Sequence, residues 1–461
     1  MQKFFEKKYV HFFNVCCFLF IIFLILINLY NPSSFKILGT VLAIIGLILL
    51  KKFKINNKYL FIILLIIPFI IRFSLLFLDY GSLVSDYEWF YNNAVAFSKG
   101  MSLDKNYIAL FPYLHLYVIV LGTFFKILGS QYSVVVFTNL LLELIGIFFL
   151  YQTVKNKSYS KKLLFLYLYN PFSILWIPMC HSVIAVNTFL IIVFYFFLKI
   201  DFSKKYILYS LLTGIFMGIA NNFRPVLIIF VIAIAIYYIN LIFRKYKWQK
   251  LFLSFILITL SFISVNKVLL LTTEYNIDTK IKRSQSGWSI FVGSNINSKG
   301  LWNEEDSKYF IQLASQYDVT TAHTLVKNEA LKRYKSYGLK NIPFMISKAK
   351  ILGSNLPEYT SQSFFEFVLH KFSIIEYVFK IYLFCYLLLI FLLNLFNLYK
   401  KMKLKVLMSK YDVLIIFALG LFLAGLLVEV HARYFLPILL PLIYTAVTRT
   451  IDNSQNTKNK I

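Results

Sequence analysis

The chain has little charge, few acidic residues and few cysteines. Charged residues make up 15% of its 461 positions, against roughly a quarter in ordinary soluble domains. Acidic residues number 20 and basic residues 48, which leaves a net charge of +28. The four cysteines show no metal-ligand spacing and lie in or beside apolar runs, at Cys16, Cys17, Cys180 and Cys385. This composition disfavours a soluble domain and a cysteine-based metal site, and we expect the cysteines to be buried packing residues.

Long apolar runs fill most of the chain. Hydrophobic residues make up 59% of it, and the mean hydropathy is +0.71. Thirteen apolar segments follow one another, at 9–30, 35–50, 59–79, 109–128, 132–153, 163–178, 182–198, 206–222, 225–243, 251–271, 374–398, 412–429 and 433–448. Runs of this length can cross a bilayer as helices, so the sequence predicts an all-α polytopic membrane protein. The first run is too long for the core of a cleavable signal peptide.

The basic residues gather in short clusters between the apolar runs. The clusters lie at 51–54, 155–162, 199–205, 244–250 and 400–405. In a soluble protein this charge would suggest nucleic acid, but here the positive-inside rule accounts for it, and no nucleic-acid partner is expected. If segment 109–128 does not cross the membrane, all five clusters lie inside with the N-terminus. We therefore expect about 12 transmembrane helices, both termini in the cytoplasm, and 109–128 at the outer surface.

This topology divides the chain into a membrane part and an outer part. The predicted transmembrane domain comprises 1–272 and 371–461, with an outer loop at 80–131 and an outer helical subdomain at 273–370. The polar residues that are hardest to explain then meet on the outer side. A transporter would instead concentrate them near the midplane, where only Glu143 and Arg72 are candidates.

Asp86 is the strongest catalytic candidate. It lies in Ser85-Asp86-Tyr87-Glu88, a capping-box frame in which Ser85 caps a helix and Glu88 reaches back to its start. The predicted helix runs to Gly100. The box does not need Asp86, which is free to act as a general base or a metal ligand. Asp86 and Glu88 are two residues apart and do not share a helix face, so they are not an acid–base couple.

Two arginines lie at predicted outer helix ends. Arg224 precedes Pro225, which we expect at the first position of the next helix. Arg224 either reaches lipid headgroups or binds a phosphate, for which its forked donors are well suited. Arg433 either pairs with Glu429 four residues earlier to anchor a turn, or holds an anionic group together with His431 while Glu429 orients it.

A loop rich in glycine, asparagine and tryptophan precedes a predicted helix at Asn303. It carries Trp288, Asn295 and Trp302, and Asn303 is expected to cap a helix with acids in its first turn. Aromatic rings with amide side chains are typical of sugar sites, whereas aromatics alone also anchor loops at a membrane interface. Both interpretations stay open for this loop.

The order of these motifs resembles a known family. The motifs are Asp86 in the first outer loop, Leu110-Phe-Pro-Tyr113, Phe223-Arg-Pro225, Gly287-Trp-x4-Gly-Ser-Asn295, Leu301-Trp-Asn-x2-Asp306 and Glu429-Val-x2-Arg-Tyr-x2-Pro437. From about residue 70 to 445 the chain resembles bacterial membrane glycosyltransferases of the protein O-mannosyltransferase and aminoarabinose-transferase type, within the GT-C superfamily.

The resemblance implies an enzyme that takes a sugar from a polyprenyl-phosphate carrier. Such enzymes pass the sugar, usually with inversion, to a glycan, lipid or protein acceptor on the outer face of the bacterial plasma membrane. The acid of the first outer loop, here Asp86, would serve as base or metal ligand. Many relatives have two adjacent acids there, whereas this chain has Tyr87 after Asp86. A divalent metal is therefore left open, and no other cofactor is expected.

The resemblance also assigns expected roles to other residues. Arg224 and Arg433, with His431, would bind the donor phosphate. The further substrate-binding candidates are Glu88, Tyr91, Asn222, Trp288, Asn295, Trp302 and Glu429. The alternative functions are a lipid-linked saccharide flippase or other transporter, and a polysaccharide polymerase or ligase.

Overall fold

The structure is a computed structural model that describes residues 2–30, 32–52, 58–202, 205–278, 287–368 and 373–448. Within these ranges the chain forms helices joined by turns and loops, with no β-strand. The predicted all-α class is therefore confirmed. Residues 53 and 54 of the first lysine cluster, residues 203 and 204 of the third, and the predicted domain boundary at 370 and 371 lie outside the described residues.

Six of the described helices are long and apolar enough to cross a membrane. They are α1 (Gln2–Leu29), α7 (Tyr132–Val154), α11 (Tyr206–Phe223), α13 (Trp248–Ile277), α19 (Ser373–Lys403) and α20 (Lys410–Leu427). Shorter apolar helices accompany them: α2 (Ser34–Lys52), α3 (Lys58–Ser74), α6 (His115–Leu128), α10 (Val183–Lys199), α12 (Ile228–Phe243) and α21 (Leu436–Thr448). The chain is thus a multi-pass helical protein by length and composition.

One predicted span is not a continuous helix. Segment 163–178 is divided into α8 (Ser160–Leu168) and α9 (Pro171–Trp176). The break has a local cause, because Pro171 has no N–H to donate to the preceding turn. The side chain of Asn170 accepts a hydrogen bond from the Phe172 amide at 3.1 Å and caps the second piece.

The helices pack closely where small residues allow it. On α11, Gly214 and Gly218 face α13, and a Cβ on Gly214 would lie 2.3 Å from the Ile258 carbonyl oxygen. Small residues four apart let two helices approach through their backbones, as in membrane-protein interfaces. α10 packs between α7, α11 and α21, with most of its residues buried.

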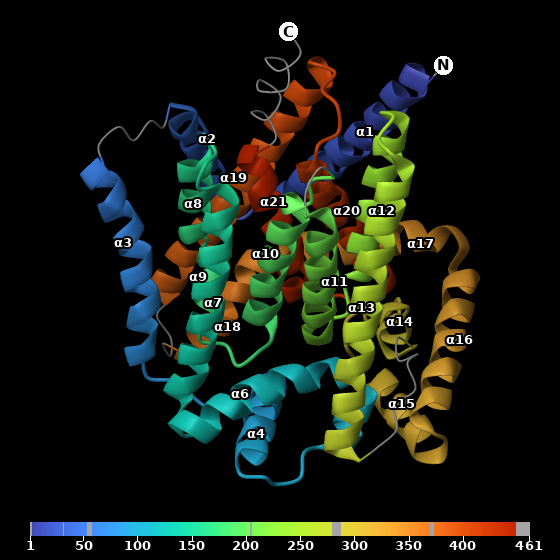
Figure 1. Cartoon of the computed structure of the whole chain (residues 1–461). Helices are drawn as coiled ribbons and strands as arrows, with labels where there is room; N and C mark the ends of the chain where they lie inside the picture. The colour runs from blue at the N-terminus through green and yellow to red at the C-terminus, as the bar shows by residue number, and fades with distance from the viewer. Residues whose placement is uncertain are drawn as a thin grey trace.

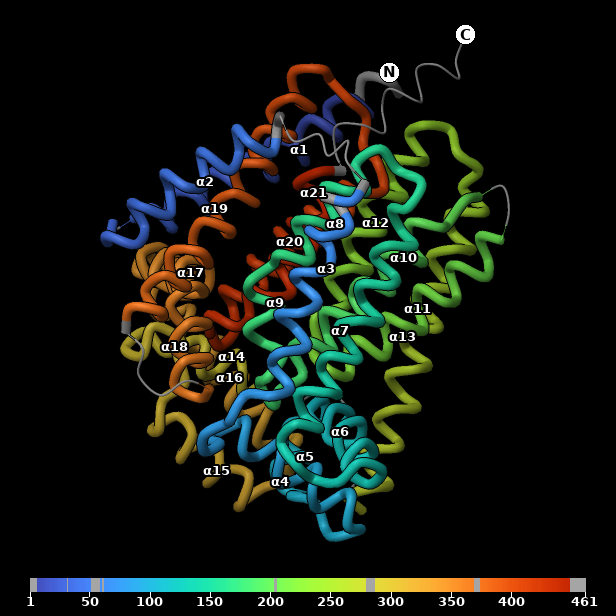
Figure 2. Tube along the Cα trace, turned by 90° about the vertical axis from the view of Figure 1, so that its left-hand side faces the viewer, coloured from blue at the N-terminus to red at the C-terminus, as the bar shows by residue number. Residues whose placement is uncertain are grey.

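The two ends of the bundle differ in what they carry. α1 begins, and α7, α10, α12 and α19 end, at the end drawn at the top of Figure 1. The lysine-rich connectors after these four helices therefore lie at one end. Figure 2 shows α4 (Ser85–Ser98), α5 (Lys105–Leu110), α6 and α15 (Glu304–Gln316) at the opposite end. Which end faces the cytoplasm stays a prediction.

The segment 109–128 lies at this second end. η2 (Pro112–Leu114) joins α5 to α6, which lies across the ends of the other helices in Figure 1 and packs on α4. This arrangement fits the expectation of a segment at the surface.

The segment between α13 and α19 has two parts. α14 (Gly287–Gly293), α15 and α16 (Val319–Tyr337) surround a small core of their own, built on Trp288, Phe291, Phe310 and Val326. α17 (Asn341–Ser354) and α18 (Leu356–Val368) contribute to the main core instead. The predicted boundaries of an outer subdomain at 273 and 370 stay predictions.

Candidate functional site

α4 carries Asp86 but does not begin as predicted. Ser85 is its first residue and has a left-handed φ of 53°, so the N-cap position falls on Val84, which has no capping side chain. The predicted capping box of Ser85 and Glu88 is therefore wrong. The helix does end before Gly100, whose φ of 67° suits glycine and whose amide donates to the Phe97 carbonyl at 3.1 Å.

Asp86 forms an ion pair with Arg433. Its Oδ2 lies 2.6 Å from Arg433 Nη2, and the two side chains are 35% and 15% exposed. Arg433 belongs to η4 (Ala432–Phe435), which follows an extended His431. Because Glu429 precedes this extended residue, it is not one helical turn from Arg433. The alternative of a Glu429–Arg433 pair across one helical turn is therefore wrong, since the described residues contain no ion pair between them. The alternative in which Glu429 orients Arg433 stays a prediction.

Arg224 lies beside Arg433 on a shared aromatic ring. Its guanidinium carbon is 4.0 Å from the centre of the Tyr434 ring, and that of Arg433 is 5.9 Å from the same centre. The ring thus holds two cations near one another. The start of the next helix differs from the prediction, because α12 begins at Ile228 and not at Pro225.

The loop that carries Glu429 is held by the segment after α13. The Glu429 amide donates to the Ser289 carbonyl at 2.6 Å, and the Val430 amide donates to the Gly300 carbonyl at 2.9 Å. A Cβ on Gly293 would lie 2.1 Å from the Val428 carbonyl carbon, so this approach requires glycine. The 287–300 segment thereby places Glu429 near the arginines.

Glu429 has an unusual ionisation. The pKa of its carboxyl is raised to about 7, chiefly by burial and also by the nearby Asp86. Arg433, Arg224 and Lys348 act in the opposite direction without cancelling the effect of burial. A carboxyl with this pKa can hold or release a proton near neutral pH.

His431 cannot supply the positive charge expected of a phosphate ligand. Burial, together with Arg433 and Arg224, lowers its pKa to about 3, so its ring is neutral near pH 7. Its Nδ1 accepts a hydrogen bond from the Arg433 amide at 3.3 Å. The remaining proton is therefore on Nε2, which can donate a hydrogen bond but not a charge.

Several residues of this site were not found from the sequence. The Tyr107 and Tyr113 hydroxyls have raised pKa values because of burial, and both feel the charge of Glu429. Lys348 on α17 is fully buried, and burial lowers its pKa to about 7. Its Nζ donates to the Gly293 carbonyl at 2.5 Å. Tyr113 and Tyr434 stand in the motifs quoted above, whereas no sequence signal pointed to Lys348.

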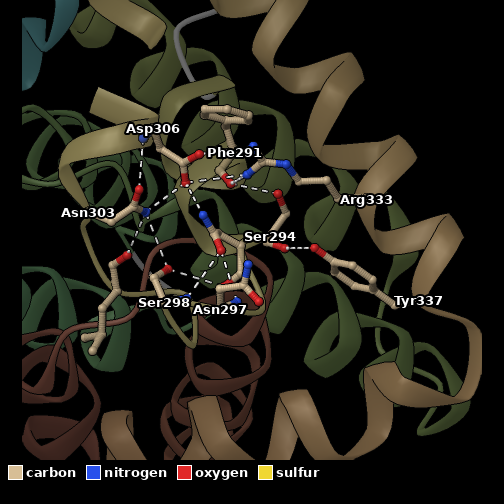
Figure 3. Close-up of polar contacts among 10 residues, drawn as sticks. Phe291, Ser294, Asn297, Ser298, Asn303, Asp306, Arg333 and Tyr337 are labelled. Carbon is tan, nitrogen blue, oxygen red and sulfur yellow. Dashed lines mark hydrogen bonds and ion pairs between the residues drawn. The ribbon is translucent and has the colours of Figure 1, made fainter. Parts of the chain in front are cut away.

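The candidates in the 287–306 loop mostly have structural contacts. Trp288 is 7% exposed and packs on Phe310. Asn295 Nδ2 donates to Asp306 Oδ2 at 2.9 Å, and Asp306 belongs to the polar cluster of Figure 3. Asn303 caps α15 as predicted, accepting from the Asp306 amide at 2.9 Å. These contacts leave Trp288 and Asn295 few means to bind a sugar.

The other predicted substrate residues differ in their surroundings. Trp302 is 58% exposed. Asn222 donates to Asn266 Oδ1 on α13 at 2.9 Å, so its amide serves a contact between helices. Glu88 and Tyr91 line a surface groove on α4.

The buried ionisable residues of the membrane part pair with each other. Arg72 Nη2 lies 3.4 Å from Glu143 Oε1, and both side chains are fully buried. Arg72 also donates to the Leu168 carbonyl at 2.7 Å, and the Tyr167 hydroxyl donates to Glu143 at 3.2 Å. This network joins α3, α7 and α8 and satisfies charges that a transport path would need free.

The described residues contain no group of three or more His, Cys, Asp or Glu side chains placed to hold a metal ion. No protein-family model matches the chain, and no curated protein matches it. Among solved structures it is similar to ArnT from Cupriavidus metallidurans bound to undecaprenyl phosphate. The identity is 13%, over 88% of this chain and 81% of that chain, with a TM-score of 0.37. A likeness at this level assigns neither a family nor an activity to the chain.

Proposed function

We propose that this chain is a glycosyltransferase that moves a sugar from a polyprenyl-phosphate carrier to an acceptor on the outer face of the membrane. The observation that carries the proposal is one carboxylate and two arginines from three distant parts of the chain. Asp86 pairs with Arg433 at 2.6 Å, and Arg224 shares the Tyr434 ring with Arg433.

These groups match the needs of an inverting transfer. The acceptor hydroxyl oxygen forms a bond to the anomeric carbon while the bond from that carbon to the phosphate oxygen breaks. Asp86 takes the hydroxyl proton, and the electron pair of the broken bond leaves with the phosphate. Arg224 and Arg433 stabilise the negative charge that develops there, which is the kind of electrostatic assistance that preorganised cations provide.

The ion pair sets the order in which the donor and the acceptor engage the site. While Arg433 holds Asp86, the paired carboxylate oxygen is occupied by the guanidinium, and Arg433 in turn is occupied by the carboxylate. A donor phosphate competes with Asp86 for Arg433, so donor binding frees the base for the acceptor. Glu429 and the neutral His431 lie next to this exchange, where they can hydrogen-bond sugar or acceptor hydroxyls.

The buried charges of the membrane part do not support the alternative of a transporter. Its best candidates, Arg72 and Glu143, are fully buried and paired with each other. The alternative of a polymerase or ligase also uses arginines at an outer face but does not need Asp86. Substitution of Asp86 therefore separates the two enzyme classes.

The experiment is to measure undecaprenyl phosphate binding, and transfer from a panel of polyprenyl-phosphate-linked sugars, by the purified full-length protein. Arg224→Ala and Arg433→Ala should each weaken binding about ten- to a hundred-fold, because each loses a charge-assisted hydrogen bond of about 1.5–3 kcal/mol. Arg433→Lys should give a partial defect, since it keeps the charge and loses the fork.

A matched control is Arg244→Ala. Arg244 pairs with Glu6 at 3.4 Å at the other end of the bundle, so its loss removes an arginine without touching the site. Full binding and turnover in both site variants would refute the proposed function.

A further inference from the structure

A groove on the other side of α4 has no part in the ion pair described above. It has a volume of about 390 Å³ and is bordered by the 80–83 segment, one face of α4 and the start of α7. Glu88, Tyr91 and Asn92 are spaced by three and four residues, so they share that face of the helix. Asp86 is two residues from Glu88 and points to a different side. The groove is therefore separated from the Asp86–Arg433 pair by the helix itself.

The aromatic wall of the groove is held in place by hydrogen bonds. Tyr132 lies between Tyr80 and Tyr91, with ring-centre separations of 4.9 and 6.0 Å. The Tyr132 hydroxyl donates to the Pro178 carbonyl at 2.7 Å. The hydroxyls of Tyr80 and Tyr91 likewise donate to backbone carbonyls, those of Leu75 and Ser130. Tyr80 also stacks on Phe367 at 5.6 Å, so a ligand can contact only the parts of the rings that line the groove.

Exposed polar groups line the same groove. Ser82, Glu88 and Asn92 are exposed and line the groove, and together they offer a hydroxyl, a carboxylate and an amide. Glu88 is the one charged residue among those that line it. A groove with an acid and no cation repels phosphates and other anions and tolerates neutral or cationic ligands.

We propose that this groove is a saccharide-binding subsite for an uncharged or cationic sugar, distinct from the transfer centre. Rigid aromatic rings pack on the CH faces of a pyranose, and a few placed polar groups bind its hydroxyls, as in sites of this size. The ligand would be a sugar of the acceptor that lies beyond the reacting one, passing the start of α4 toward Asp86. This assignment to the acceptor rests on the proposed function, whereas saccharide binding in the groove does not.

The test uses the full-length protein in nanodiscs of sugar-free lipids and saturation-transfer NMR. The probes are the methyl glycosides of glucose, galactose, mannose and N-acetylglucosamine, with glucosamine and glucose 6-phosphate for comparison. At least one glycoside should receive saturation, and glucose 6-phosphate should bind about ten-fold more weakly or not at all. A glucosyl diacylglycerol in the nanodisc is then tested as a competitor of the glycosides. Competition would identify the natural ligand as a lipid-borne saccharide, and no competition would identify a free one; either result supports the subsite.

Variants on exposed positions locate the binding without disturbing the core. Glu88→Gln should remove any preference for glucosamine, and Glu88→Ala with Asn92→Ala should weaken glycoside binding about ten-fold. The control Glu305→Ala removes an exposed acid from α15, outside the groove, and should bind glycosides normally. No saturation of any glycoside, or equal saturation in the double variant, would overturn the subsite.

The two proposals fail separately. Arg433→Ala should lose undecaprenyl phosphate binding and keep glycoside binding, whereas the Glu88 and Asn92 variants should do the reverse. If no glycoside binds in the groove, the proposed donor site is unaffected. If turnover is intact in both arginine variants, the result on glycoside binding in the groove is unaffected.

Discussion

Asp86→Asn is the substitution that distinguishes a base from a structural acid. Asparagine keeps the size of the side chain and an oxygen that can still accept from Arg433. It removes the negative charge that lies 2.6 Å from the guanidinium. The variant therefore changes the electrostatics of the pair and little of its packing.

The magnitude follows from the exposure of the pair. Asp86 is 35% exposed and Arg433 15%, so solvent screens their attraction, and the pair contributes about 1 kcal/mol or less to stability. The same free energy opposes the donor phosphate, which must displace Asp86 from Arg433. Removing the charge should leave donor affinity unchanged or raise it by up to about five-fold. Turnover should fall by about 10² or more, the scale of a lost general base.

The assay measures undecaprenyl phosphate affinity and sugar transfer on the same preparation. Asp104→Asn is the matched control, because Asp104 lies in the same outer loop and caps α5, a task that asparagine also performs. The control should keep both affinity and turnover. Near wild-type turnover in Asp86→Asn would refute the base role, and a joint loss of donor affinity and turnover would indicate a structural acid instead.

Three further predictions concern ionisation, topology and packing. Between pH 4.5 and about 7, Glu429 is protonated in the folded protein and ionised in the unfolded chain. Its contribution to the free energy of unfolding is therefore fully present at low pH and is lost as the pH rises to about 7. Glu429→Gln should flatten that part of a curve of melting temperature against pH, and an unchanged curve would contradict the raised pKa. A single cysteine at Lys157 in a cysteine-free background should react with an impermeant thiol reagent after lysis only, and labelling of intact cells would reject the topology. Trp288→Ala should destabilise the α14–α16 core by about 3–5 kcal/mol, whereas Trp302→Ala should change stability by under about 0.5 kcal/mol; equal proteolysis rates would contradict this contrast.

The sequence predicted what depends on neighbours along the chain. Apolar runs of spanning length became helices, because a helix satisfies its own backbone hydrogen bonds and needs no distant partner. Gly100 ends α4 and Asn303 begins α15 for equally local reasons, a left-handed φ in one case and a side-chain cap in the other. The lysine clusters after α7, α10, α12 and α19 also follow from chain order, since alternate connectors lie at the same end.

The tertiary structure decided which polar groups meet. Arg433 has an acid four residues away, yet it pairs with Asp86, which is 347 positions away. The two tryptophans that the sequence placed in one loop differ in exposure, 7% for Trp288, which lies in α14, and 58% for Trp302. No sequence pattern marked Lys348 as a site residue, because its burial depends on contacts with Gly293 and Gly300 from another part of the chain. Partners and burial depend on how helices from distant parts of the chain pack, and no local pattern records that.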